Sequence, residues 1–318
     1  MHMADALVSP AVAAGAGAVA ATMIAVAATK VKKIKRDDIV PLMGVMGAFV
    51  FAAQMINFTI PGTGSSGHVI GGILLSAILG PWAAFITLCS VLIIQCLVFA
   101  DGGLLALGCN IVNMAVTSCL IAYPLVFRPI AGHRYSPGRL ITAAVVSSIT
   151  ALEIGALGVT FETELSGITA LPTGTFLAFM LPIHLAIGAV EGIATAAVLY
   201  FIARYRPETI YDYDRTTGSP SSSKGRRKVI IGFIIGAVVF ASAFTWIASA
   251  NPDGLEWSIA RTSGLTDLPS AVAPTAIMPD YDSTFAGIIG ATIVMILLWA
   301  VTALLFHSLR PARHHIKK

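Results

Sequence analysis

The sequence predicts an all-α polytopic membrane protein, with seven helical spans followed by a two-span helical hairpin. Hydrophobic residues make up 56% of the 318-residue chain and charged residues only 11%, whereas an average soluble domain carries about 25% charged residues. From Ile39 to Ala100 there is no Asp, Glu, Lys or Arg. Because about 20 apolar residues suffice to cross a bilayer as a helix, a chain of this composition predicts many crossings.

Nine apolar runs are the predicted spans, and the third is short for a full crossing, so we expect it to tilt or re-enter. The pair Gly80-Pro81 follows it and is typical of a break between helices. No basic leader or cleavage site precedes the first run, so we expect a retained span rather than a signal peptide. The runs lie near residues 8–29, 39–57, 69–79, 82–100, 103–127, 139–160, 174–203, 229–250 and 284–306.

The distribution of Lys and Arg predicts the orientation. If 69–79 counts as one crossing, every basic cluster falls on the cytoplasmic side, as the positive-inside rule requires. We therefore expect a multi-pass protein of the bacterial inner membrane with its N-terminus outside and its C-terminus in the cytoplasm. The net charge of +4 resides in these short clusters, so nucleic acid is not an expected partner. The clusters lie within 30–36, 128–139, 204–206, 224–228 and 310–318.

The chain divides into three parts by composition. A membrane domain (1–206) is followed by a cytoplasmic linker (207–228), polar and rich in Ser and Gly, and then by the two-span hairpin (229–318). There is no convincing internal repeat, which argues against a secondary transporter built from duplicated halves. The four cysteines fall inside apolar runs without CxxC spacing, so packing is the expected role for them.

The first two residues, Met1 and His2, can form a chelate. The free α-amine, the next amide nitrogen and the imidazole of His2 can make fused rings around one cation, nearly in a plane and with one position open. Planar nitrogen sites suit Ni(II) or Cu(II). His68, in an outward loop, is a candidate for the fourth nitrogen. The alternatives are a chance histidine at position 2 and a loop-end histidine bonded to a carbonyl at position 68.

Three stretches, MHMADALVSPAV, PGTGSSGHVIGG and MLPIHLAIGAVEGIATA, resemble the CbiM/NikM family. Its members are the substrate-binding (S) components of energy-coupling factor transporters for cobalt and nickel, which are ABC-type importers. The stretch NPDGLEWS, in the outer loop of the final hairpin, resembles the small NikN/CbiN accessory component. The resemblance implies a metal site at Met1, His2 and His68. The start MHMADAL is closer to nickel-type members, and Co(II) is the alternative substrate.

An S component has no ATPase of its own, and this sequence contains no Walker A motif GxxxxGK[ST]. The family therefore implies a transmembrane coupling (T) protein and ATPase subunits as partners, besides membrane lipid. We expect a non-catalytic subunit without a cofactor that binds Ni(II) or Co(II) as transported substrate. An intramembrane metalloprotease would need a motif such as HExxH, which is absent. A metal sensor without transport would need a soluble signalling domain, for which the cytoplasmic pieces are too short.

Other ionisable residues leave two readings open. Glu153, His184 and Glu191 lie inside apolar spans, where such groups are expensive and usually functional. His184 and Glu191 share a helix face and suggest either a second metal stop or proton relay, or a polar clamp between helices, with the clamp favoured.

Three further groups have similarly paired interpretations. Asp253 and Glu256 offer either a weak first stop for a cation or a structural turn. The C-terminal His314 and His315 suggest a solvated tail or a metal relay. Small residues at Ala13, Gly17 and Ala21 suit partner docking or internal packing.

Overall fold

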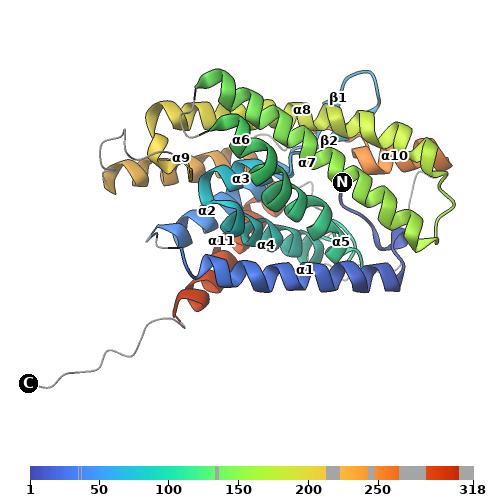
Figure 1. Cartoon of the computed structure of the whole chain (residues 1–318), viewed down its shortest axis with the longest axis horizontal. Coiled ribbons are helices and arrows are strands. Elements are labelled where there is room, and N and C mark those ends of the chain that lie inside the picture. Colours follow the sequence, from blue (N-terminus) through green and yellow to red (C-terminus); the bar gives the residue numbers. More distant parts are fainter. Residues whose placement is uncertain are drawn as a thin grey trace, which may run out of the picture.

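The computed structural model describes residues 1–34, 36, 38–132, 136–212, 223–242, 248–264 and 284–307. The Ser-rich middle of the expected linker and the tail with His314 and His315 lie outside these ranges. The chain forms a bundle of helices with one small hairpin of strands (Figure 1). The helices are α1 (Pro10–Val31), α2 (Ile39–Gln54), α3 (Gly72–Leu79), α4 (Pro81–Phe99), α5 (Leu107–Asn110), α6 (Arg128–Ala131), α7 (Pro137–Ser166), α8 (Thr173–Tyr205), α9 (Ser223–Ser242), α10 (Gly254–Ser263) and α11 (Thr284–His307).

Five helices of the described part are long and apolar enough to cross a membrane. They are α1, α4, α7, α8 and a continuous helix, Leu107–Ala131, in which the π-helical segment η2 (Ile111–Phe127) joins α5 to α6. The apolar helix α2 and the apolar part of α11, Gly287–Val301, are shorter. The helical, polytopic membrane class is confirmed, whereas the count of seven plus two crossings stays a prediction.

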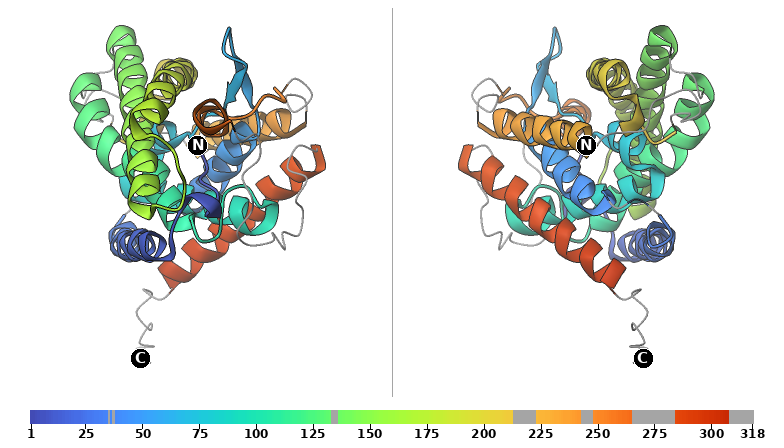
Figure 2. Two further views of the ribbon diagram at one scale, coloured as in Figure 1. Left: turned by 90° about the vertical axis from the view of Figure 1, so that its right-hand side faces the viewer. Right: turned by 90° about the vertical axis from the view of Figure 1, so that its left-hand side faces the viewer.

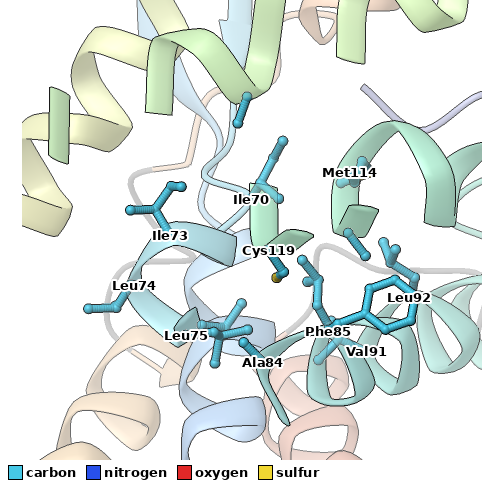
Figure 3. Close-up of a cluster of buried hydrophobic side chains, with 14 of the residues drawn as sticks. Ile70, Ile73, Leu74, Leu75, Ala84, Phe85, Val91, Leu92, Met114 and Cys119 are labelled. Carbon is cyan, nitrogen blue, oxygen red and sulfur yellow. The ribbon is translucent and has the colours of Figure 1, made fainter. Parts of the chain in front are cut away.

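The short third run forms α3, which is buried along its whole length. Its side chains pack in an apolar cluster with α4 and η2, where Ile73, Leu75, Phe85 and Cys119 meet (Figure 3). The helix stops at Gly80, whose φ of 84° is in the region that favours glycine, and α4 starts at Pro81. All four cysteines are buried and unpaired, as expected of packing residues.

Helices α7 and α8 pack with their backbones close together. Gly188 and Gly192 of α8, four residues apart, face the main chain of Ile149 and Val145 on α7, and a side chain at either glycine would collide with it. Small residues at this spacing let membrane helices approach closely. This contact holds the helix that carries His184 and Glu191 in a fixed position.

Among the described residues, the basic segments around Arg36 and Arg128 are held to the bundle by specific contacts. The Arg36 guanidinium donates to the carbonyl of Ile78 (3.1 Å). Arg128 Nε pairs with Asp212 at 2.8 Å, and the amide of Tyr211 donates to the carbonyl of Ala77 at 2.8 Å. Residues 207–212, the start of the expected linker, are therefore packed on the bundle, and they include the 3-10 turn η3 (Pro207–Thr209).

The C-terminal helices α9 and α11 pack on α2 (Figure 2). Phe49 of α2 makes edge-to-face contacts with Phe233 and Phe240 of α9, at centroid distances of 5.1 and 5.3 Å. Gly47 of α2 lies under Leu298 of α11. This docking brings residues 248–264, including α10, next to the N-terminus of the chain (Figure 1).

Two of the three small residues of α1, Ala13 and Gly17, pack inside the chain. Ala13 is buried, and the backbone of Gly17 lies against Gly108 of α5 so closely that a side chain at Gly108 would collide. Ala21 is exposed. Only 17% of the most apolar window of α1 is buried, so most of this helix faces outward from the bundle (Figure 1).

Candidate metal centre

The N-terminal segment before α1 runs into the bundle and is fixed there by hydrogen bonds. The amide of Met3 donates to Asn110 Oδ1 (2.7 Å), and Asn110 Nδ2 donates back to the Met3 carbonyl (3.2 Å). Asp5, in the 3-10 turn η1 (Asp5–Leu7), accepts from the amides of Leu105 (2.8 Å) and Ala106 (3.1 Å) through Oδ1. These bonds hold the first two residues in a defined place.

A β-hairpin delivers His68 to the same place. Strands β1 (Phe58–Ile60) and β2 (Ser65–Gly67) pair antiparallel, with Phe58 opposite Gly67. The turn between them uses Gly62 and Gly64 at positive φ, which only glycine adopts without strain. Neither the hairpin nor α10 was predicted from the sequence, because both are short and lack a long apolar run.

The three residues expected at the metal site lie together. The Met1 amine is 3.4 Å from Nε2 of His68, and the rings of His2 and His68 stack with centroids 5.2 Å apart and an angle of 21° between their planes. Met1 is only 5% exposed, and the side chain of His2 is only 6% exposed. The site is thus a buried pocket at the end of the bundle opposite the basic segments.

The contacts of the two imidazoles show which proton His68 carries and which group lies against the His2 ring. Nδ1 of His68 lies 3.2 Å from the carbonyl oxygen of Val69. A carbonyl can only accept, so Nδ1 carries the proton and Nε2 offers its lone pair toward the amine. Nδ1 of His2, the ring nitrogen that would close a six-membered chelate with the His2 amide, lies 3.3 Å from Asp101 Oδ1. An ion on that nitrogen would therefore replace Asp101.

Both imidazoles are neutral in this pocket. Burial, which disfavours the charged ring, and second the nearby positive amine together lower the pKa of His2 to about 3. The same two causes, in the same order, hold the pKa of His68 well below its usual value. Neutral imidazole is the form that binds transition metals.

Asp253 forms an ion pair with the Met1 amine, at 2.7 Å to Oδ2. Its other oxygen, Oδ1, accepts from the amides of Leu255 and Glu256, each at 2.8 Å, and so caps α10. Glu256 accepts in return from the Asp253 amide, which completes a capping box. Burial alone would raise the pKa of Asp253, but the amine charge and these donated bonds outweigh it and keep that pKa below its usual range. The capping pattern explains why the sequence suggested a structural turn; the contact with Met1 was missed.

The segment that carries Asp253 is tied to the hairpin that carries His68. Ser66 donates from its amide to the Pro252 carbonyl (2.8 Å) and from its hydroxyl to the Asn251 carbonyl (2.7 Å). Trp257 Nε1 donates to the carbonyl of Thr63 at 3.0 Å. The C-terminal part of the chain therefore forms one wall of the site.

The buried ionisable residues of the spans separate into different roles. Glu191 accepts from the amides of Ile70 (2.7 Å) and Gly71 (3.0 Å), so it clamps α8 to the segment after His68. His184 bonds within its own helix, with Nδ1 2.8 Å from the Met180 carbonyl. Glu153 has a buried Oε1 that makes no hydrogen bond among the described residues. The two residues that share a helix face thus have different partners.

Side chains alone do not make a complete metal site here. Across the described ranges, no group of three His, Cys, Asp or Glu side chains is close enough together to hold one ion. The chelate predicted from the first two residues would add the main-chain nitrogens of Met1 and His2 to the available donors.

Comparison with known families identifies both parts of the chain. Residues 2–209 match the CbiM family, a cobalt uptake substrate-specific transmembrane region, and residues 227–307 match the PDGLE domain. A protein of Archaeoglobus fulgidus described as a fused nickel transport protein, NikMN, is 33% identical over 287 residues, covering 88% of this chain and 91% of the relative.

Other relatives have nickel or cobalt in their names. The fused nickel transport protein NikMN of Rhodobacter capsulatus is 28% identical and covers 88% of this chain and 83% of its own length. The cobalt transport protein CbiM of Sorangium cellulosum is 29% identical and covers 66% of this chain and 94% of its own length. The crystal structure of a truncated transition metal transporter superposes with a TM-score of 0.56 at 32% identity, over 64% of this chain and 99% of that one.

Proposed function

This chain belongs to the CbiM family of cobalt uptake substrate-specific transmembrane regions and also carries a PDGLE domain, and we propose that it captures Ni(II) for uptake across the membrane. The ion would be held by four nitrogens, namely the Met1 amine, the His2 amide and imidazole, and Nε2 of His68. The observation that carries this proposal is the meeting of the amine, His2 and His68, with Nε2 of His68 3.4 Å from the amine.

Two of the candidate ligands are supported by a partner outside the donor set. Val69 fixes the proton of His68, and Asp253 contacts the amine. Such outer partners orient ligands and raise their basicity. Asp101 differs, because it contacts Nδ1 of His2, the nitrogen that the ion would take. The two supports come from separate segments, so the complete fold is needed to shape the site.

Nickel is favoured by two observations. Planar nitrogen donors suit Ni(II), and three relatives that span most of this chain are described as fused nickel transport proteins. Cobalt is the second candidate because other relatives are described as cobalt transport proteins. The two candidate metals are distinguished by letting Ni(II) and Co(II) compete for the purified chain. If the chain captures nickel, Ni(II) should bind more tightly than Co(II).

The arrangement in the membrane completes the proposal. Seven spans (1–206), a cytoplasmic linker (207–228) and a two-span hairpin (229–318) would place the metal centre at the outer face and the basic segments in the cytoplasm. A transmembrane coupling protein and ATPase subunits would supply the energy. The chain itself would be a non-catalytic subunit.

The decisive experiment is metal analysis of the purified chain with its native start. One extra residue before Met1 converts the amine into an amide and moves the new amine out of the chelate. We expect one tightly bound nickel per native chain and loss of tight binding in the extended chain. Equal binding by the two chains would refute the chelate.

A further inference from the structure

A small cavity lies beside the Met1 amine and reaches into the bundle. Its walls include Met1, His68 and Asp253 from the candidate centre, together with His184 of α8 and apolar residues such as Ile187. His184 is the one imidazole in this wall that the proposed four-nitrogen site does not use. Its surroundings indicate a further role for it.

The orientation of His184 follows from two contacts. Nδ1 lies 2.8 Å from the carbonyl of Met180 in the preceding turn, so Nδ1 carries the proton and Nε2 carries the lone pair. On the other side, a Cβ added to Gly254 would lie 3.2 Å from Cε1, the ring carbon between the two nitrogens. The ring therefore projects from α8 toward the segment that holds Asp253.

Nε2 of His184 is buried and makes no hydrogen bond with any residue in the described ranges. A buried polar atom without a partner is unfavourable, and such atoms in native proteins usually bind water or an ion. Glu191 is seven residues along the same helix, but its oxygens accept from Ile70 and Gly71. The lone pair is thus available to a ligand in the cavity.

We propose that Nε2 of His184, Nε2 of His68 and the Asp253 carboxylate form a second, weaker position for a divalent transition metal. This inference rests on the proposed function, because the four-nitrogen site supplies the ion. Two imidazoles and one carboxylate bind Ni(II), Co(II) or Zn(II) and leave room for water. His68 belongs to both positions, so an ion can move inward without losing all its protein ligands.

The second position is not closed in the metal-free arrangement. Asp253 is engaged by the Met1 amine at 2.7 Å, and no three His, Cys, Asp or Glu side chains of the described part surround one point closely enough to bind an ion. The ion itself must draw the three side chains together. The ion should therefore bind only weakly at the second position, as expected of a position that it later leaves.

The test uses the chain with one residue added before Met1, in which the chelate is lost. Co(II) serves as the probe because its absorption reports ligand number and geometry. We expect residual binding, about 100-fold or more weaker than in the native chain, with the spectrum of a site of low coordination number. His184→Phe in this background should lower the residual affinity about 10-fold or more, the usual effect of losing a ligand or its support.

Two further variants make the result specific. His184→Gln removes the ring without adding bulk, so it covers the case in which His184→Phe does not fold. Ile187→Val alters the same cavity wall without a metal-binding atom and should leave the residual binding unchanged. Residual binding that survives both His184 variants overturns the proposal, and so does its complete absence from the extended chain.

The outcome is separable from that of the proposed function. A native chain that binds no nickel tightly refutes the four-nitrogen site, whatever the extended chain does. A native chain that binds nickel tightly, combined with an extended chain that binds no Co(II), refutes only the second position.

Discussion

The α-amine of Met1 and the carboxylate of Asp253 lie 2.7 Å apart, although 252 positions separate them in the chain. Both groups are largely buried, with side chains 3% and 17% exposed. An ion pair of this kind joins the PDGLE domain directly to the first residue of the chain, which immediately precedes the CbiM match. The C-terminal part is therefore a component of the candidate metal centre, which leads to the first prediction.

Asp253→Asn should lower nickel affinity about 10-fold, because a partner that orients a ligand typically contributes this much. Asn is also a good helix N-cap, so α10 should persist. The measurement is calorimetric titration of Ni(II) together with thermal unfolding. Glu256→Gln is the matched control, since it alters the capping box without contacting the amine. If Asp253→Asn leaves nickel affinity unchanged, Asp253 serves only to cap α10 and does not support the metal site.

His68→Ala should leave the amine, the His2 amide and the His2 imidazole as ligands, with water in the fourth position. We expect nickel affinity to fall on the order of 10–100-fold or more and the absorption spectrum to shift. Thr59→Val is the control, because Thr59 lies in the same hairpin and bonds Ser249 rather than the centre. His68 would be excluded as a ligand if neither affinity nor spectrum changed.

Asn110→Ala should loosen the N-terminal segment. The variant loses both hydrogen bonds to Met3 and leaves the buried Met3 amide unpaired, a destabilisation of about 1–3 kcal/mol, whereas the Met3 carbonyl still accepts from the amide of Gly103. Nickel affinity should fall as well, because the first two residues are no longer held in place. Thermal unfolding and metal titration are both needed, and a stable variant with lost affinity would show that Asn110 acts on the site alone.

Gly192→Val should disrupt the contact between α7 and α8. The new side chain would collide with the backbone of Val145, and overpacking of this kind costs about 1–3 kcal/mol or more. Gly174→Val is a suitable control because a Cβ at Gly174 meets no atom within 4 Å. Comparable melting temperatures in detergent for the two variants would contradict the close approach seen here.

The sequence by itself determined the helical segments of this protein. Each predicted apolar run from 8–29 to 284–306 overlaps a helix, since hydropathy is a property of each stretch taken alone and needs no knowledge of its neighbours. The helix break at Gly80-Pro81 was also predicted from the local sequence alone. The proposed chelate of Met1 and His2 could be formulated from the sequence for the same reason, because its atoms are adjacent along the chain.

Only the tertiary structure decided what surrounds that chelate. Asp101 reaches His2, and Asp253 reaches the amine, through packing of distant segments that no local pattern encodes. It also separated two residues that the sequence treated as a pair: Glu191 accepts from two backbone amides, whereas Nε2 of His184 has no hydrogen-bond partner among the described residues. Helix spacing places two residues on one face, but only the neighbouring helices determine which partners that face meets.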